Sequence, residues 1–249
     1  EISGFVAELA NLAPNKHLPY VGKSAFAHKG GIHVAALRRN INSYQHIDPG
    51  LVGNKMRTVV SEQSGRGNLI SKADELGIKI EDPAVLKDVL ANRKDLESRG
   101  FSFESAEASV ALMIHRLQKG YQAPFRLIDY FATVERREGR GSFAEAMVKI
   151  MVNDEVIHTI AEGEGPVNAL DRALRKGLVP IYPRLAEFQL ADYKVRIIDG
   201  TMGTASVTRV LIDTQNGHNR WSTVGASDNI IEASWLALYD SIEYGLALS

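Results

Sequence analysis

The sequence predicts an α+β protein in which small helical subdomains precede a domain of two βββα repeats. Apolar residues recur at helical spacing in the first half of the chain, whereas the second half alternates and is rich in β-forming residues. The stretches 148–174 and 208–238 also share one order of elements: strand, hairpin turn, strand, Gly-rich loop and amphipathic helix. One more strand precedes each stretch, so the second half contains two βββα units.

Five helices are expected in the first half. Pro14 ends the first, Pro83 begins the fourth behind Asp82 as its cap, and Gly120 ends the fifth. The expected ranges are 2–12, 24–39, 68–77, 83–100 and 104–120. Turn-rich segments separate these helices, which is typical of small helical subdomains.

The second half is expected to hold six strands and two helices. Asn153–Asp154 and Asn216–Gly217 are hairpin signals, because these residue types tolerate the left-handed conformations of tight turns. The expected strands are 124–139, 143–153, 155–163, 185–199, 203–213 and 218–225, and the helices are 165–177 and 228–248. A sheet that packs one face on its own helices leaves another apolar face to cover, by a second copy of the chain or a second sheet.

The composition excludes several classes of protein. The 249 residues are 45% hydrophobic and 24% charged, so the chain can bury a core, and a net charge of -1 gives no reason to expect nucleic acid as a partner. The absence of cysteine excludes disulfides and thiolate zinc sites and fits a reducing, cytoplasmic compartment. No apolar run reaches the roughly 20 residues of a membrane span, so no membrane partner is expected.

The stretch 24–40, SAFAHKGGIHVAALRRN, places two adjacent glycines between His28 and His33. Each glycine costs a helix about 1 kcal/mol against alanine, which favours a close approach by a ligand or another backbone, with His33 presented for proton transfer. Equally, both histidines can be ordinary polar helix residues. Their spacing of five does not match a helical zinc pair, and the run has no Asp or Glu, so no metal site is expected.

Three Gly-rich loops are candidates for binding small anions or ligands, each with a structural alternative. SEQSGRGN at 61–68 can hold a phosphate through backbone N–H groups or simply cap a helix. GEGP at 163–166 and GTMGTAS at 200–206 can supply donors to a pocket or form ordinary turns. No catalytic triad, nucleotide fingerprint or carboxylate pair is present in a recognisable pattern.

Three motifs in a fixed order carry a family resemblance. FAHKGGIHVAAL, YQHIDPGLVGN and SEQSGRGN, at 26–37, 44–54 and 61–68, resemble the region after the barrel in the α-isopropylmalate, homocitrate and citramalate synthase family. Their form is most similar to the citramalate synthase branch. The second half resembles the family's regulatory domain, with GEGPVNALDRAL and GASDNIIEASWLAL as repeat signatures.

The resemblance implies a C-terminal part of a longer acyltransferase, without its catalytic TIM barrel. The parent enzyme would condense acetyl-CoA with pyruvate and need a divalent metal, whereas this chain would hold no cofactor and be inactive alone. The start at Glu1, inside a helix-like stretch, agrees with that expectation. The implied domains are 1–22 (barrel end or linker), 23–78 and 79–130 (helical linker subdomains I and II) and 131–249 (regulatory dimerisation domain).

The resemblance also implies two sets of site residues. His33 matches a family histidine implicated in acid–base chemistry, and Tyr44 matches the tyrosine that accompanies it; Gly30–Gly31 stands where the family often has Ser-Gly. The regulatory domain would be a homodimer that binds isoleucine or leucine as feedback inhibitor. The implied effector-binding residues are Leu190, Tyr193, Ile197, Val207, Asp228 and Ile230.

Other functions remain open at this point. The chain can instead be a free-standing amino-acid-binding module, a purely structural dimerisation unit, or the same region of a leucine-regulated isopropylmalate synthase. Leucine and isoleucine differ only in methyl placement, a difference worth roughly 1–3 kcal/mol in an apolar pocket.

Overall fold

The computed structural model describes residues 83–247 except 140, 199 and 218. Of the earlier residues it describes 15, 17–22, 24–28, 31–40, 43–45 and 47–58, and short pieces at 2–3, 6, 69–70, 73–74 and 78. The chain divides into two compact units, Glu1–Leu90 and Ala91–Ser249. Most of the helices expected at 2–12 and 68–77, the cap at Asp82 and the loop 61–68 lie outside the described residues.

The first unit contains a short parallel pair and one described helix before α4. Strand β1 (Ala27–His28) pairs with β2 (Arg57–Thr58), and helix α2 covers Gly31–Arg39. The expected helix over 24–39 is therefore wrong in its first half, since residues 24–28 form a turn and β1. The helix begins at Gly31 instead, where glycine is tolerated, and Ala27 and His28 pair with Arg57 and Thr58.

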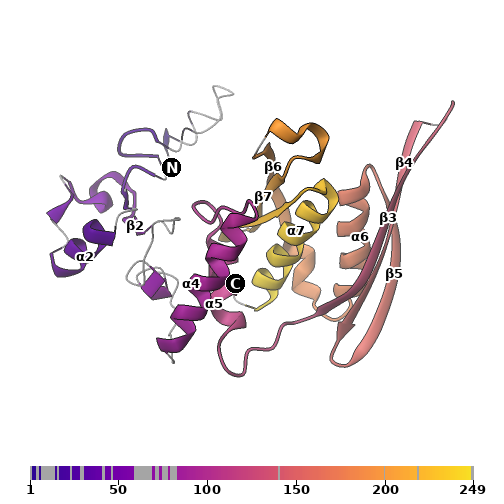
Figure 1. The fold of residues 1–249 in the computed structure, drawn as a ribbon, viewed down its shortest axis with the longest axis horizontal. Helices are drawn as coiled ribbons and strands as arrows, with labels where there is room; N and C mark the ends of the chain where they lie inside the picture. Colours follow the sequence, from indigo (N-terminus) through magenta and orange to yellow (C-terminus); the bar gives the residue numbers. More distant parts are fainter. Residues whose placement is uncertain are drawn as a thin grey trace. The chain divides into compact units, whose positions relative to one another are not determined.

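The second unit confirms the α+β class and the two βββα repeats (Figure 1). It begins within α4 (Pro83–Ser98) and continues with α5 (Glu107–Arg116). The first repeat contains β3 (Arg126–Arg137), β4 (Gly141–Val152), β5 (Glu155–Gly163) and α6 (Pro166–Leu178). The second contains β6 (Gln189–Ile197), β7 (Thr208–Asn216), β8 (Asn219–Ser227) and α7 (Ile230–Ala247). Short 3-10 turns, η3 (Pro183–Glu187) and η4 (Gly200–Ala205), flank β6.

Both hairpin signals lie at hairpins. Asn153 and Asp154 have φ of 48° and 65°, the left-handed pair that a two-residue turn needs between β4 and β5. In the second repeat the pairing runs up to Asn216 and Asn219, so Asn216 still belongs to β7 and the turn begins at Gly217, one residue later than expected. Gly217 supplies the positive φ there.

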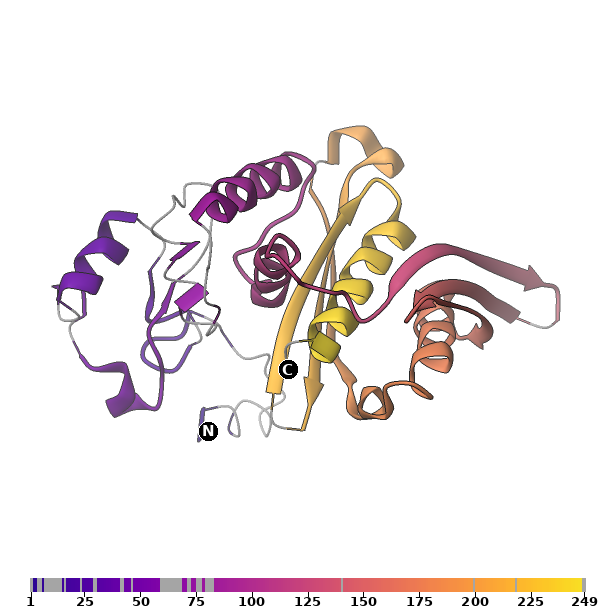
Figure 2. The ribbon, with the colours of Figure 1, turned by 90° about the horizontal axis from the view of Figure 1, so that it is seen from below.

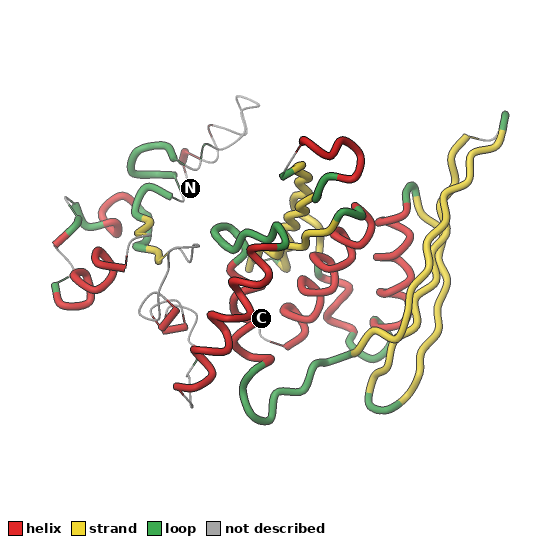
Figure 3. Tube along the Cα trace, viewed as in Figure 1, coloured by secondary structure: helices red, strands yellow, loops and turns green. Residues whose placement is uncertain are grey.

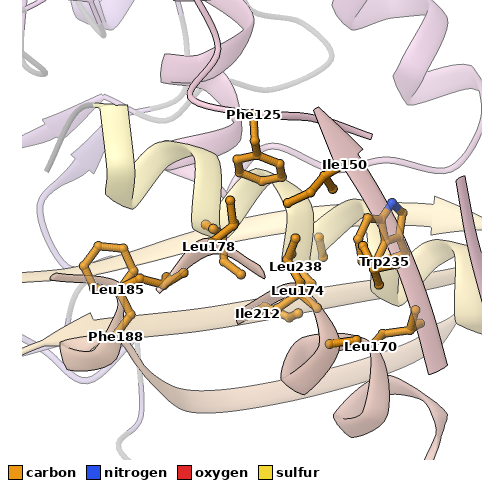
Figure 4. Close-up of a cluster of buried hydrophobic side chains, with 14 of the residues drawn as sticks. Phe125, Ile150, Leu170, Leu174, Leu178, Leu185, Phe188, Ile212, Trp235 and Leu238 are labelled. Atoms are coloured by element: carbon orange, nitrogen blue, oxygen red, sulfur yellow. The ribbon is translucent and has the colours of Figure 1, made fainter. Parts of the chain in front are cut away.

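The helices α6 and α7 lie between the two antiparallel sheets, β3–β4–β5 and β6–β7–β8 (Figures 2 and 3). Alternate residues of β4, from Ala144 to Val152, are buried against α6. Leu170 and Leu174 of α6 meet Trp235 and Leu238 of α7 in the shared core (Figure 4). Two amphipathic layers therefore bury one another, as the repeat pattern requires.

The outer face of the first sheet carries an uncovered apolar row. Phe131 pairs with Met147, which pairs with Ile160, so the three side chains lie side by side on the face away from α6. Phe131 is 57% exposed and Ile160 47% exposed. This row agrees with the expectation that one sheet face lacks a cover within the chain.

A buried polar cluster joins α5 to α7. The Arg116 guanidinium donates to Glu243 Oε1 at 3.0 Å, to Glu243 Oε2 at 2.7 Å and to Asp240 Oδ1 at 2.7 Å. Ser109 Oγ donates to Asp240 Oδ2 at 2.9 Å, and the Tyr121 hydroxyl donates to Glu243 Oε1 at 2.9 Å. Two carboxylates thus share one arginine: Glu243 is buried, whereas the Arg116 side chain is 39% exposed.

We expect Asp240→Asn to stabilise the chain increasingly as the pH rises. Burial raises the pKa of Asp240 above its usual range, despite the opposing effect of Arg116. The folded state therefore holds the proton more tightly than the unfolded state, and wild-type stability falls as the pH rises from the ordinary carboxyl pKa through the raised one. Asparagine carries no charge and escapes this loss. Urea unfolding across acid to neutral pH measures the difference; a pH-independent difference would contradict the assignment.

Candidate functional site

His33 and Tyr44, the two residues expected to act in catalysis, lie together in the first unit. Their rings stack with centroids 4.2 Å apart and planes 25° apart. Both side chains are exposed, Tyr44 by 48%. His33 lies in the first turn of α2, and Tyr44 follows that helix before the turn η2 (Pro49–Val52). The two rings thus support one another by stacking, and the His33 ring remains exposed.

His28, the other histidine of the motif, lies deeper than His33. Its Nε2 atom is buried and finds no hydrogen-bond partner among the residues that the structure describes, and the same holds for the side-chain nitrogen of Gln45. Burial, and secondarily the charge of His33, lowers the pKa of His28. His28 is therefore a neutral imidazole beside His33, and the sequence pattern did not distinguish these two environments.

The second candidate site begins on the edge strand β6. Tyr193 pairs with Ile212 and Ile197 pairs with Thr208, so both β6 side chains lie on the sheet face that packs on α7. Tyr193 is half-buried, and its oxygen lies 2.6 Å from Ser234 Oγ of α7. Ser234 gives its own proton to the Ile230 carbonyl at 2.6 Å. With that proton engaged, Ser234 Oγ accepts from the Tyr193 hydroxyl.

Leu190 lies on the same face but at the far end of β6. Leu190 and Tyr193 are three residues apart and would point to opposite faces of a regular strand. The bulge between Leu190 and Asp192 brings both side chains to the same face. Leu190 is 56% exposed and Ile197 is 59% exposed. Their partners Thr214 and Thr208 lie six residues apart on β7, so about 20 Å separates them at the usual rise. A single amino-acid ligand cannot contact both residues of one chain.

Val207 packs away from the other expected effector residues. Its Cγ1 atom lies 2.6 Å from the point where a Cβ on Gly100 would stand, so the side chain faces the end of α4. Its neighbour Thr208 pairs with Ile197 and faces α7. Successive side chains of a strand point to opposite faces, which explains why Val207 and Ile197 separate.

Asp228 and Ile230 lie at the start of α7, at the same end of the sheet as Ile197. Both are exposed, Ile230 by 45%. Asn229 caps the helix: its Oδ1 accepts from the N–H of Ile231 at 2.9 Å and of Glu232 at 3.4 Å. Asn229 Oδ1 therefore occupies these two N–H donors at the start of α7. The sequence SDN before an apolar run was the available signal for this cap.

The described residues offer no ligand set for a divalent metal. Nowhere in this part of the chain do three His, Asp or Glu side chains gather as a metal site would require. The metal implied by the family resemblance therefore has no place in the chemistry assigned to these residues. Nor is any helix of the described part long and apolar enough to cross a membrane.

Two families match the chain in succession. Residues 20–100 match the family described as homocitrate synthase post-HMGL domain-like, and residues 104–246 match the LeuA allosteric (dimerisation) domain. The boundary between the matches falls just after α4, and the second match contains both βββα repeats.

Named relatives agree with these matches. The (R)-citramalate synthase of Geobacter sulfurreducens is 50% identical over 249 residues, which cover 99% of this chain and 47% of the relative. The (R)-citramalate synthases of Synechocystis sp. and Aquifex aeolicus are 50% and 47% identical over 255 and 251 residues, covering 99% of this chain and 46% and 47% of the relatives. The chain spans about half the length of these relatives. The resemblance inferred from the three motifs is confirmed, and the chain belongs to the family of the LeuA allosteric (dimerisation) domain.

Proposed function

We propose that the chain is the linker and feedback-regulatory part of a citramalate synthase, an acyltransferase that condenses acetyl-CoA with pyruvate on the route to isoleucine. Its second unit would bind isoleucine or leucine as the inhibitor. One observation carries the proposal: apolar side chains of β6 that face the α7 side remain exposed, within a domain of an allosteric family. Exposed apolar surface of this kind marks a binding or association site.

The proposed effector site is shared by two copies of the chain. Leu190 lies too far from Ile197 for one ligand to reach both in one chain, yet both are exposed on one face of β6. A second copy that packs along this edge would bring its Leu190 end near the first copy's Ile197 end, as two-fold symmetry provides. The dimerisation family to which the second unit belongs supports such a homodimer.

The residues at the Ile197 end suit an aliphatic amino acid. Ile197 and Ile230 offer apolar contact for the side chain. The Tyr193 oxygen, which keeps acceptor capacity, and the exposed Asp228 carboxylate suit the α-ammonium group. With Asn229 covering two N–H groups of α7, we assign the ligand carboxylate to the Gly-rich turn η4, where Gly203 departs from helical geometry (φ 60°, ψ −125°).

We expect isoleucine, or failing that leucine, to raise the melting temperature of the chain. A ligand that binds only the native state stabilises it by about 2.7 kcal/mol at a hundredfold excess over its Kd. Tyr193→Phe keeps the packing of the ring and should reduce the shift, because the acceptor oxygen is lost. His33→Ala lies in the other unit and serves as the control, with the shift unchanged.

Calorimetry and thermal unfolding at millimolar ligand measure this effect. If neither amino acid raised the melting temperature, the effector site would be contradicted. If Tyr193→Phe and His33→Ala reduced the shift in melting temperature equally, the assignment of the site to the second unit would be contradicted. A monomer by light scattering at micromolar concentration would contradict the shared site.

A further inference from the structure

The end of α4 is held by the segment that follows the η4 turn. Gly100, two residues beyond α4, has φ of +100° and no room for a side chain, since a Cβ would stand 2.6 Å from Val207 Cγ1. The Phe101 N–H closes the helix end by donating to the Leu96 carbonyl at 3.1 Å. The backbone of Gly100 therefore lies directly against Val207.

Arg209 also holds the end of α4, through hydrogen bonds to the backbone of the residues that follow the helix. Its Nε donates to the Gly100 carbonyl at 2.6 Å, and its Nη2 donates to the Phe101 carbonyl at 3.3 Å. Arg209 lies two residues after Val207 and hence on the same sheet face. One charged side chain thus engages two successive carbonyls just beyond α4, and charge-assisted bonds of this kind are the stronger class.

This contact connects two elements with different roles. On one side, Val207 joins η4 to β7, and its carbonyl accepts from the Ile198 N–H at 2.9 Å, so it also holds the end of β6 beyond Ile197. On the other side, α4 begins in the first unit and ends in the second. It is a continuous helix, so a displacement of its last turn is passed along its axis.

We infer that Val207 and Arg209 couple the proposed effector site to the linker. Through these two residues, the conformation of η4 and of the end of β6 sets the position of the α4 end. The inference rests on the proposed effector site and deepens it, since it assigns Val207 to transmission rather than to ligand contact. Arg209 acts as a positioning residue through the carbonyls of residues 100 and 101, and touches no ligand.

Hydrogen exchange of the backbone amides of residues 91–101, with and without isoleucine or leucine, tests the coupling in the complete 249-residue chain. In the wild type, ligand binding should slow exchange at the α4 end by about fivefold or more, the lower range of common coupling factors. Arg209→Gln should abolish the slowed exchange. It should weaken ligand binding by no more than the coupling factor seen in the wild type, about fivefold, because the coupling is reciprocal. Val207→Ala should keep affinity and weaken the effect.

Arg196→Gln is the matched control. Arg196 pairs with Arg209 across β6 and β7, shares its sheet face and is exposed, so its removal should leave both affinity and slowed exchange intact. If Arg209→Gln does not fold by circular dichroism, Val207→Ala alone decides. Slowed exchange that persists in the tested variants overturns the inference, as does loss of ligand binding, which would place these residues in the site.

The outcomes separate this inference from the proposed function. A wild-type chain that binds neither amino acid by calorimetry overturns the effector site and the coupling with it. Binding without any change of exchange at residues 91–101 overturns the coupling alone.

Discussion

Gly225→Ala is expected to destabilise the second unit by about 3 kcal/mol or more, at or beyond the upper end of ordinary overpacking. A Cβ at this position of β8 would stand 2.0 Å from the Ala233 carbonyl oxygen and 2.8 Å from the Ala237 nitrogen. Both atoms belong to the backbone of α7, so no flexible side chain can move aside. The strand and the helix must separate instead, which opens the contact between β8 and α7 at Ala233 and Ala237.

Gly165→Ala provides the matched comparison. Gly165 precedes the other repeat helix, α6, has an extended φ of −164°, and has no atom within 4 Å of the point where a Cβ would stand. Gly165 is the N-cap of α6, and alanine there should cost about 0.5–1 kcal/mol, because alanine is a poorer N-cap residue than glycine. Urea unfolding of both variants gives the result. Equal losses would show that the close approach of β8 and α7 does not determine stability.

The repeated half of the fold was predictable because its signals are local. Asn153–Asp154 and Asn216–Gly217 mark tight turns through their own backbone preferences, and alternation between them marks strands. The two helices that follow bury apolar faces at helical spacing. Each signal needs only a few neighbouring residues, so no knowledge of the tertiary structure was required.

The arrangement of the effector residues was less predictable because it depends on register. A single bulge after Leu190 changes which residues of β6 share a face. Val207 lies one residue before Thr208, the partner of Ile197, so its side chain points to the opposite face of the sheet. Neither feature has a local sequence signature. The contact between Val207 and Gly100 also joins positions more than a hundred residues apart, beyond the reach of any periodicity.

The same distinction holds for the histidine motif. Two adjacent glycines are unsuited to a helix interior, yet the predicted helix extends through them to Ser24. The neighbouring strand β1 forms by pairing with Arg57–Thr58, about thirty residues away. No residue within the motif predicts that pairing. Tertiary pairing therefore decided the conformation of residues whose own preferences were ambiguous.

His33→Ala is expected to lower turnover by about 10²–10⁴-fold, the usual range for losing a general acid or base. The measurement uses a longer protein, in which this chain is joined to the other half that its relatives contain. The expectation follows from the proposed function and from geometry. His33 is exposed, its ring is stacked on Tyr44 at 4.2 Å, and its orientation is therefore defined before any substrate arrives. An oriented imidazole can donate or accept a proton at a reacting acyl donor.

The pH dependence distinguishes this role from a structural one. Removal of a proton-transfer group should eliminate one limb of the pH profile of kcat/KM, whereas loss of packing would lower the profile uniformly. Tyr44→Phe keeps the stacked ring and should leave that limb in place, so it controls for ring contact. His28→Ala removes the neighbouring buried imidazole and should affect stability more than the pH profile. If His33→Ala retained both limbs with near-normal turnover, the histidine would be an ordinary polar residue of α2 and the catalytic contribution of this unit would have to lie elsewhere.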